Sequence, residues 1–193
     1  MVFAPVETSL ASGQVAVVNG PNGAGKSTLL RIIAGLLTPA AGTVDLVVHG
    51  ATRDALQRRR HLGYVAPDLT LYRELTAAEN LQFFARLHGR TLDRGDLIER
   101  LTAVGLRGRG RDLVGSYSSG MRQRLKYAFA LLADPPVLLL DEPTANLDTD
   151  GIAMVERVLE TYRGCPGRIA VVATNEVREK DWGDVRIQLE PGL

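Results

Sequence analysis

The chain has 193 residues and carries 23 Lys and Arg against 22 Asp and Glu, so its formal net charge is +1. This balance gives no general attraction to nucleic acid or to an acidic membrane surface, and we expect no nucleic-acid partner. No apolar run approaches the roughly 18 residues of a membrane-spanning helix, and the N-terminus lacks a signal-peptide pattern. The single cysteine, Cys165, excludes an internal disulfide and fits a reducing compartment. We therefore expect a cytoplasmic protein.

Apolar runs rich in β-branched residues recur along the chain. They are continuous rather than alternating, which is typical of strands buried on both faces of a parallel sheet. The predicted strands are Val15–Val18, Val44–Val48, Val137–Leu140 and Ile169–Ala173. Helical spacing is found between the last two, at Ile152, Val155, Leu159 and Tyr162, and Gly164 closes that helix. Alternating strands and helices predict a doubly wound α/β core.

A glycine-rich loop follows the first predicted strand. Residues 20–27 read G-x-x-x-x-G-K-S, with a strand before them and an amphipathic helix after them. Glycines let the backbone wrap around phosphates, Lys26 neutralises the β- and γ-phosphates, and the Ser27 hydroxyl completes a Mg²⁺ shell. The sequence therefore predicts an ATP site with bound Mg²⁺, whose phosphate-binding residues are Asn22, Gly23, Ala24, Gly25, Lys26, Ser27 and Thr28.

The middle of the chain, residues 75–133, has helical patterns and no convincing strand. Thr76 and Glu79 form a capping box that begins a helix ending near Gly89. A second helix follows and ends at Gly105. We predict a helical subdomain over residues 75–133, inserted into an α/β core formed by residues 1–74 and 134–193. Arginine clusters at 58–60 and at 107, 109 and 111 are interpreted as solvated surface, because no aromatic residues for base stacking interleave with them.

Two serines and a glycine stand before another helical pattern. Ser118, Ser119 and Gly120 precede a helix whose apolar face includes Leu125, Phe129 and Leu132. Hydroxyls and free amides at a helix N-terminus can bind an anion. Taken alone, the stretch is equally well explained as a plain N-cap.

Two carboxylates follow the third predicted strand. Asp141 and Glu142 emerge at the carboxyl end of the apolar run "VLLL". After a phosphate-binding loop, this order predicts that Asp141 holds Mg²⁺ together with Ser27, and that Glu142 polarises an attacking water as a general base.

A single amide follows the fourth predicted strand. Asn175 stands after "VVAT", at the carboxyl end of the run, where ligands bind in open α/β sheets. Asn is also a common turn residue. The local sequence does not choose between these two interpretations.

These motifs, in this order, resemble the ATP-binding cassette (ABC) ATPases over residues 13–189. Ser118-Ser119-Gly120-Met121 is similar to the family's signature motif, with Met121 where Gln is usual, and Asn146-Leu147-Asp148 to its D-loop. The resemblance implies a P-loop NTPase fold with a RecA-like core, ATP bound with Mg²⁺, and a second cassette packed head to tail. It also implies integral membrane transporter subunits that hold the chain at the inner face of the cell membrane. The compact chain is similar to small bacterial exporter cassettes.

Three departures from the family pattern bear on turnover. The Q-loop glutamine is replaced by Pro67, and the H-loop histidine that contacts the γ-phosphate is replaced by Asn175. The chain begins close to the P-loop, and Phe3 is too near that loop to match the aromatic residue that stacks on adenine. Because an amide does not titrate near neutrality, we expect Glu142 to act as the base and Asn175 to position the γ-phosphate and the water.

We therefore expect ATPase activity that is real but slow. Two alternatives remain open at this point. One is a non-transport ABC ATPase of the iron–sulfur assembly type. The other is a nucleotide-dependent switch with little turnover.

Overall fold

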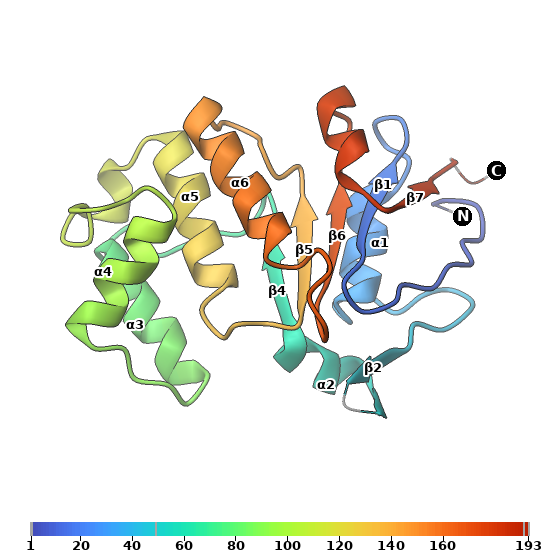
Figure 1. Ribbon diagram of the computed structural model, residues 1–193, viewed down its shortest axis with the longest axis horizontal. Coiled ribbons are helices and arrows are strands. Elements are labelled where there is room, and N and C mark those ends of the chain that lie inside the picture. The colour runs from blue at the N-terminus through green and yellow to red at the C-terminus, as the bar shows by residue number, and fades with distance from the viewer. Residues whose placement is uncertain (1, 49, 191, 193) are drawn as a thin grey trace. The chain divides into compact units, whose positions relative to one another are not determined.

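The computed structural model describes residues 2–48, 50–190 and 192 (Figure 1). The chain forms two compact units. The first contains residues 1–66, 135–143 and 159–193, and the second contains residues 67–134 and 144–158. The predicted bounds, a helical subdomain over residues 75–133 within an α/β core of residues 1–74 and 134–193, remain a prediction.

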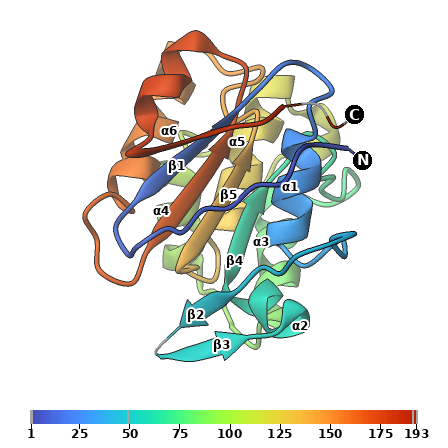
Figure 2. The same cartoon turned by 90° about the vertical axis from the view of Figure 1, so that its right-hand side faces the viewer.

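The first unit is built on a parallel sheet. Its strand order is β4-β5-β6-β1-β7, and every neighbouring pair runs parallel (Figure 2). The strands are β1 (Val15–Asn19), β4 (Leu62–Val65), β5 (Val137–Asp141), β6 (Ile169–Ala173) and β7 (Val185–Gln188). β5 is buried along its whole length, as its uninterrupted apolar sequence predicts. The predicted α/β fold with a mostly parallel sheet is confirmed.

The predicted strand at Val44–Val48 is present over residues 46–48, but its predicted place in the parallel sheet was wrong. Strand β2 (Leu46–Val48) pairs antiparallel with β3 (Ala51–Arg53) in a separate two-stranded sheet. Val47 is 62% exposed, so this apolar run is not a core strand. A short apolar run does not reveal its pairing partner, and an exposed hairpin has the same local sequence character.

Helices of the first unit support the sheet and its loops. They are α1 (Lys26–Ile33), α2 (Ala55–Arg58) and the 3-10 turns η1 (Arg59–His61) and η3 (Val177–Trp182). α1 packs against β5 and β6. The core between them contains Leu30 of the helix, with Leu139 and Val171 of the sheet. Since β1, β5 and β6 run parallel and in register, their carboxyl ends at Asn19, Asp141 and Ala173 share one edge.

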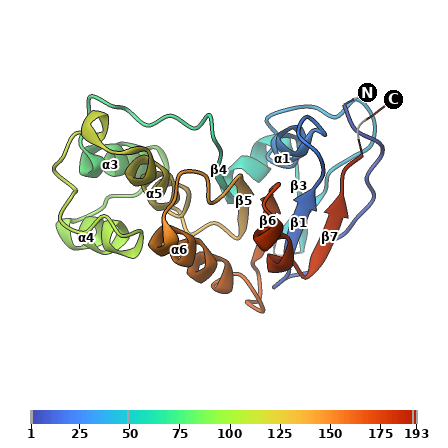
Figure 3. The ribbon, with the colours of Figure 1, turned by 90° about the horizontal axis from the view of Figure 1, so that it is seen from above.

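The second unit is helical. It contains α3 (Ala77–Leu87), α4 (Arg94–Ala103), η2 (Val114–Ser116) and α5 (Ser119–Ala130), and α6 (Thr149–Glu160) begins in it. α5 packs against both α3 and α4 (Figure 3). The only β-pairing described between residues 67 and 134 is an isolated bridge from Thr76 to Leu113.

The capping box is present at the start of α3. The Glu79 amide donates to Thr76 Oγ1 at 3.2 Å, and the Thr76 amide donates to Glu79 Oε2 at 2.8 Å. Because this signal depends on residues three apart, it is legible in the sequence. Among the described residues, no helix combines the length and the hydropathy needed to cross a membrane.

Candidate functional site

The predicted phosphate-binding loop joins β1 to α1. Gly20, Gly23 and Gly25 all have positive φ, and Gly25 is the N-cap of α1 with φ 94°. A Cβ on Gly20 would lie 2.6 Å from the Leu189 carbonyl oxygen, so glycine is required there for space as well as for conformation. Residues 22–28 therefore lie in the turn after β1 and in the first turn of α1.

Lys26 is turned back onto this loop. Its side chain is 6% exposed, and Nζ donates to Gly20 O at 2.9 Å, to Pro21 O at 3.2 Å and to Asn175 Oδ1 at 2.5 Å. Burial lowers the pKa of Lys26, and the carboxylates of Glu142 and Asp141 act in the opposite direction. The ammonium is thus held among acceptors at the edge of the sheet.

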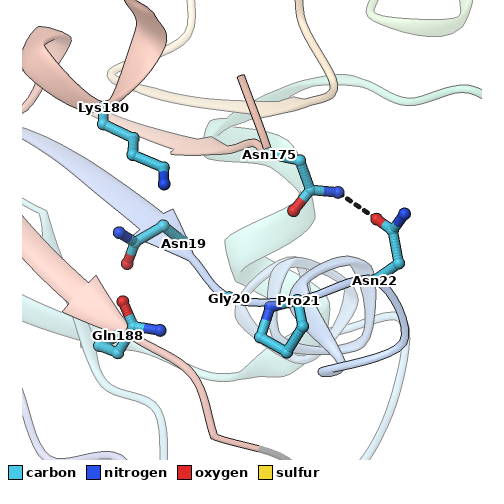
Figure 4. Close-up of a pocket in the computed structure, with 7 residues that line it drawn as sticks. All are labelled: Asn19, Gly20, Pro21, Asn22, Asn175, Lys180 and Gln188. Atoms are coloured by element: carbon cyan, nitrogen blue, oxygen red, sulfur yellow. Dashed lines mark hydrogen bonds between the residues drawn. The ribbon is translucent and has the colours of Figure 1, made fainter. Parts of the chain in front are cut away.

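Asn175 lies at the phosphate-binding loop, so the interpretation as a turn residue alone is insufficient. It follows β6, and while Oδ1 accepts from Lys26, Nδ2 donates to Asn22 Oδ1 (Figure 4). Nδ2 also lies 3.4 Å from Glu142 Oε1, at the limit of a hydrogen bond. One amide therefore connects the loop, the lysine and the carboxylate that ends β5.

The two carboxylates at the end of β5 differ in environment. Asp141 is 2% exposed, whereas Glu142 adopts a left-handed conformation with φ 49° and donates its amide to Ala173 O at 2.9 Å. Burial raises the pKa of Glu142, and Lys26 opposes this shift. A carboxylate that is stabilised less in its charged form accepts a proton more readily.

The donor set for a metal is small. Of the described residues, no group of three or more His, Cys, Asp or Glu side chains is placed to hold a metal ion. Ser27, in the first turn of α1, and Asp141, at the end of β5, supply one hydroxyl and one carboxylate. This set fits Mg²⁺, which binds through one or two protein oxygens together with substrate phosphates and water.

The serine-glycine stretch of the second unit caps α5. Ser118 is the N-cap, and its Oγ accepts from the Met121 amide at 3.1 Å. The sequence suggested that Ser119 precedes the helix, but Ser119 is the first residue of α5. Gly120 is crowded, since a Cβ there would lie 2.9 Å from the Asn146 carbonyl oxygen. The N-cap is therefore observed, and anion binding by these residues remains a prediction.

Asp148 is held by an arginine that the sequence did not single out. Asp148 Oδ1 accepts from the Gly151 amide at 2.9 Å and from Arg124 Nη2 at 2.5 Å. The Gly151 hydrogen bond and then Arg124 lower the pKa of Asp148. Arg124 lies in the run "MRQR", where nothing local distinguishes it from its neighbour Arg122.

The sequence had placed Phe3 close to the loop, but it did not reveal the cavity beside the loop. Phe3 lies beside the loop, because a Cβ on Gly25 would come within 2.6 Å of its ring. A cavity of about 370 Å³ adjoins the loop and is lined by Asn19, Gly20, Pro21, Asn22, Asn175, Lys180 and Gln188 (Figure 4). Asn19 ends β1, Lys180 lies in η3 and Gln188 ends β7. No sequence motif connects these three residues.

The fold and the loop define a P-loop nucleotide-binding protein. The profile of the family described as "ABC transporter" matches residues 3–145. The cytochrome c biogenesis ATP-binding export protein CcmA of Xylella fastidiosa (strain 9a5c) is 40% identical over 161 residues, covering 83% of this chain and 71% of CcmA. The daunorubicin resistance ATP-binding protein DrrA3 of Streptomyces coeruleorubidus is 38% identical over 178 residues, covering 91% of this chain and 56% of DrrA3.

Solved cassettes share the fold. A dimeric structure of a post-hydrolysis state of the cassette MJ0796, bound to ADP and Pi, has a TM-score of 0.80 at 27% identity and covers 95% of this chain and 84% of that one. A solved ATP-binding subunit of an ABC transporter has a TM-score of 0.83 at 26% identity and covers 98% of this chain and 80% of that one. This chain belongs to the ABC transporter family of ATPases, which bind ATP generally with Mg²⁺, and it is an ATP-binding subunit of such a transporter.

Proposed function

We propose that this chain binds Mg-ATP at residues 22–28 and hydrolyses it between two cassettes to drive export through separate membrane subunits. The observation that carries the proposal is the meeting of Lys26, Glu142 and Asn175 at one edge of the sheet, through contacts of 2.5 Å and 3.4 Å. A cation, a potential base and a neutral donor are the groups that a phosphoryl transfer to water requires.

Each group has a distinct role in this proposal. Backbone amides of the loop and Lys26 hold the phosphates, while Ser27 and Asp141 hold Mg²⁺. Glu142 accepts a proton from the water that attacks the γ-phosphorus, the bond to the bridging oxygen breaks, and ADP leaves. The raised pKa of Glu142 suits the step, because its carboxylate gains more from taking up the proton.

Asn175 serves as a neutral positioning residue. In the structure its oxygen accepts from Lys26. Phosphate oxygens are stronger acceptors, so Lys26 turns toward them on binding, and Asn175 then donates its amide hydrogens to the γ-phosphate or to the water. Because the Asn175 amide carries no charge, we propose that ATP turnover is slow. We also propose that protonation of Glu142 alone sets the fall in ATPase rate at low pH.

A second cassette completes each site. Ser118, Ser119 and Gly120 of that partner chain would clamp the γ-phosphate held by Lys26, with Asp148 at the interface. The solved relative with ADP and Pi is itself a dimer, which supports this arrangement. Integral membrane subunits would then hold the chain at the inner face of the cell membrane. Export is favoured over import because one relative is named an export protein and another a drug-resistance protein.

The division of roles is tested by two substitutions. Glu142→Gln should abolish phosphate release while Mg-ATP binding persists, because the base is lost and the phosphate contacts stay. Asn175→Ala should bind ATP and turn over several-fold more slowly than the wild type. Steady-state ATPase rates and binding of a fluorescent ATP analogue measure both. Similar, near-complete losses of turnover in the two variants would contradict the proposal.

Dimerisation is tested by dilution. If the partner's Ser118 completes the site, the rate per chain should rise with protein concentration and approach zero at high dilution. Full activity at every concentration would exclude a shared site. ATP binding without any phosphate release would instead favour a nucleotide-dependent switch, the alternative that the loss of the family's histidine at Asn175 supports.

A further inference from the structure

The cavity beside the phosphate-binding loop shares only Asn22 and Asn175 with the residues proposed to contact the nucleotide. Its wall uses the first half of the loop, Gly20, Pro21 and Asn22, and none of residues 23–28. The rest of the wall comes from Asn19, Asn175, Lys180 and Gln188 (Figure 4). The cavity thus adjoins the proposed ATP site, and most of its wall comes from other residues.

Lys180 is the charged residue in this lining. It is carried by η3, and Figure 4 shows its ammonium directed toward Asn19. The neighbouring carboxylate of Asp181 is engaged with Arg186 Nη2 at 2.8 Å. Within the part of the chain that the structure describes, the Lys180 ammonium has no ion pair or hydrogen bond. Its positive charge is therefore available to an anion in the cavity.

The remaining polar side chains in the lining are amides. Asn19 and Gln188 are register partners on β1 and β7, so their side chains end at neighbouring positions. Asn19 Oδ1 is buried and has no hydrogen-bond partner among the described residues. Amides supply N–H donors and also accept, and a buried acceptor of this kind favours a ligand that carries an O–H group.

We infer that this cavity binds inorganic phosphate, held by the Lys180 ammonium and by the amides of Asn19, Gln188 and Asn175. At neutral pH hydrogen phosphate offers negative oxygens to the ammonium and an O–H to Asn19 Oδ1. A volume of about 370 Å³ leaves room for phosphate with several waters, since one water occupies about 30 Å³ in the liquid.

The position of the cavity gives the bound phosphate a role. Asn22 and Asn175 are hydrogen-bonded to each other, and Asn175 also contacts Lys26. Both amides line the cavity, and Asn175 is the one that contacts Lys26, beside which the γ-phosphate is proposed to bind. Phosphate released by hydrolysis would enter the cavity when the pair separates. This inference rests on the proposed ATPase function, and it assigns the cavity to its product.

The test is phosphate binding to protein saturated with Mg²⁺ and a non-hydrolysable ATP analogue, so that the γ-phosphate position beside Lys26 is filled. Titration calorimetry with inorganic phosphate is carried out on the wild type, on Lys180→Gln and on the control Arg178→Gln. The control removes the same charge from an exposed residue of η3 that is not in the lining. We expect Lys180→Gln to weaken binding about tenfold, the lower end for loss of a charged hydrogen bond, and Arg178→Gln to leave it unchanged.

The outcomes separate a specific phosphate site from general attraction of anions, and the inference from the proposed function. Equal weakening of phosphate binding in the two variants would show general electrostatic attraction and would overturn the inference. Sulfate binding as tight as phosphate binding would exclude a role for the O–H group and would also overturn it. If ATP is hydrolysed but phosphate binding does not depend on Lys180, the inference fails while the proposed function stands. If phosphate binding depends on Lys180 but ATP is not hydrolysed, the proposed function fails and the anion site remains.

Discussion

Replacing Asn175 by Asp exchanges the amide nitrogen for oxygen and places a carboxylate beside the Lys26 ammonium. In the structure Asn175 Oδ1 accepts from Lys26 Nζ at 2.5 Å. A carboxylate at that position forms an ion pair with the lysine and loses the amide donor that faces Asn22 and Glu142. An ATP phosphate must then compete with a permanent anion for the same ammonium.

The cost of that competition follows from the distance. Two unit charges 2.5 Å apart interact by about 2 kcal/mol in a medium like water and by about 7 kcal/mol at an effective dielectric of 20. Asn175 is exposed, so the lower value applies. About 2 kcal/mol corresponds to roughly 30-fold weaker Mg-ATP binding.

The assay is the Kd of a fluorescent ATP analogue, with ADP measured in parallel and Asn175→Ala as the matched control. We expect Asn175→Asp to weaken ATP binding by the stated factor and ADP binding by less, because ADP lacks the γ-phosphate. Asn175→Ala should bind ATP about as the wild type does. Wild-type affinity in Asn175→Asp, or an equal loss in Asn175→Ala, would refute the reasoning.

Burial raises the folded-state pKa of Glu142 above its ordinary value of 4.5, so the folded chain loses stability as pH rises through that window. Glu142→Gln should therefore raise Tm at pH 7.5 and leave it unchanged below pH 4; a lower Tm at both would contradict this. Arg124→Ala should raise the pKa of Asp148 in a carbon NMR titration, because one of its hydrogen bonds is removed, and an unchanged pKa would dismiss the contact. Leu139→Ala, at a fully buried position of β5, should cost about 2–5 kcal/mol in urea unfolding, whereas Val47→Ala, at a position 62% exposed, should cost less than about 0.5 kcal/mol.

Local structural features of this protein could be predicted from its sequence. The capping box at Thr76 and the N-cap at Ser118 depend on atoms three residues apart. The turn at residues 20–25 depends on glycines that adopt positive φ without steric cost. Strand β5 was predictable because its buried, apolar character is continuous. In each case a few neighbouring residues carry the whole physical cause.

Strand pairing could be predicted from the sequence less well. Val44–Val48 has the composition of a core strand but ends in an exposed hairpin, while β4 and β7 were not predicted. Strand β7 alternates between buried Ile187 and exposed Arg186 and Gln188, so its sequence lacks the continuous apolar run of a central strand. The partner of a strand is set by segments far along the chain, and a local window does not contain them.

The motifs by themselves determined the class of chemistry, since the phosphate-binding loop and the carboxylates after β5 each require only their own residues and a preceding strand. Only the tertiary structure decided which side chains meet. Asn175 contacts Lys26 across 149 residues of sequence, and Asn19 lies beside Gln188 because β1 and β7 are neighbours in the sheet. Contacts of this kind depend on strand order and register, which arise from the packing of the whole core rather than from any one segment.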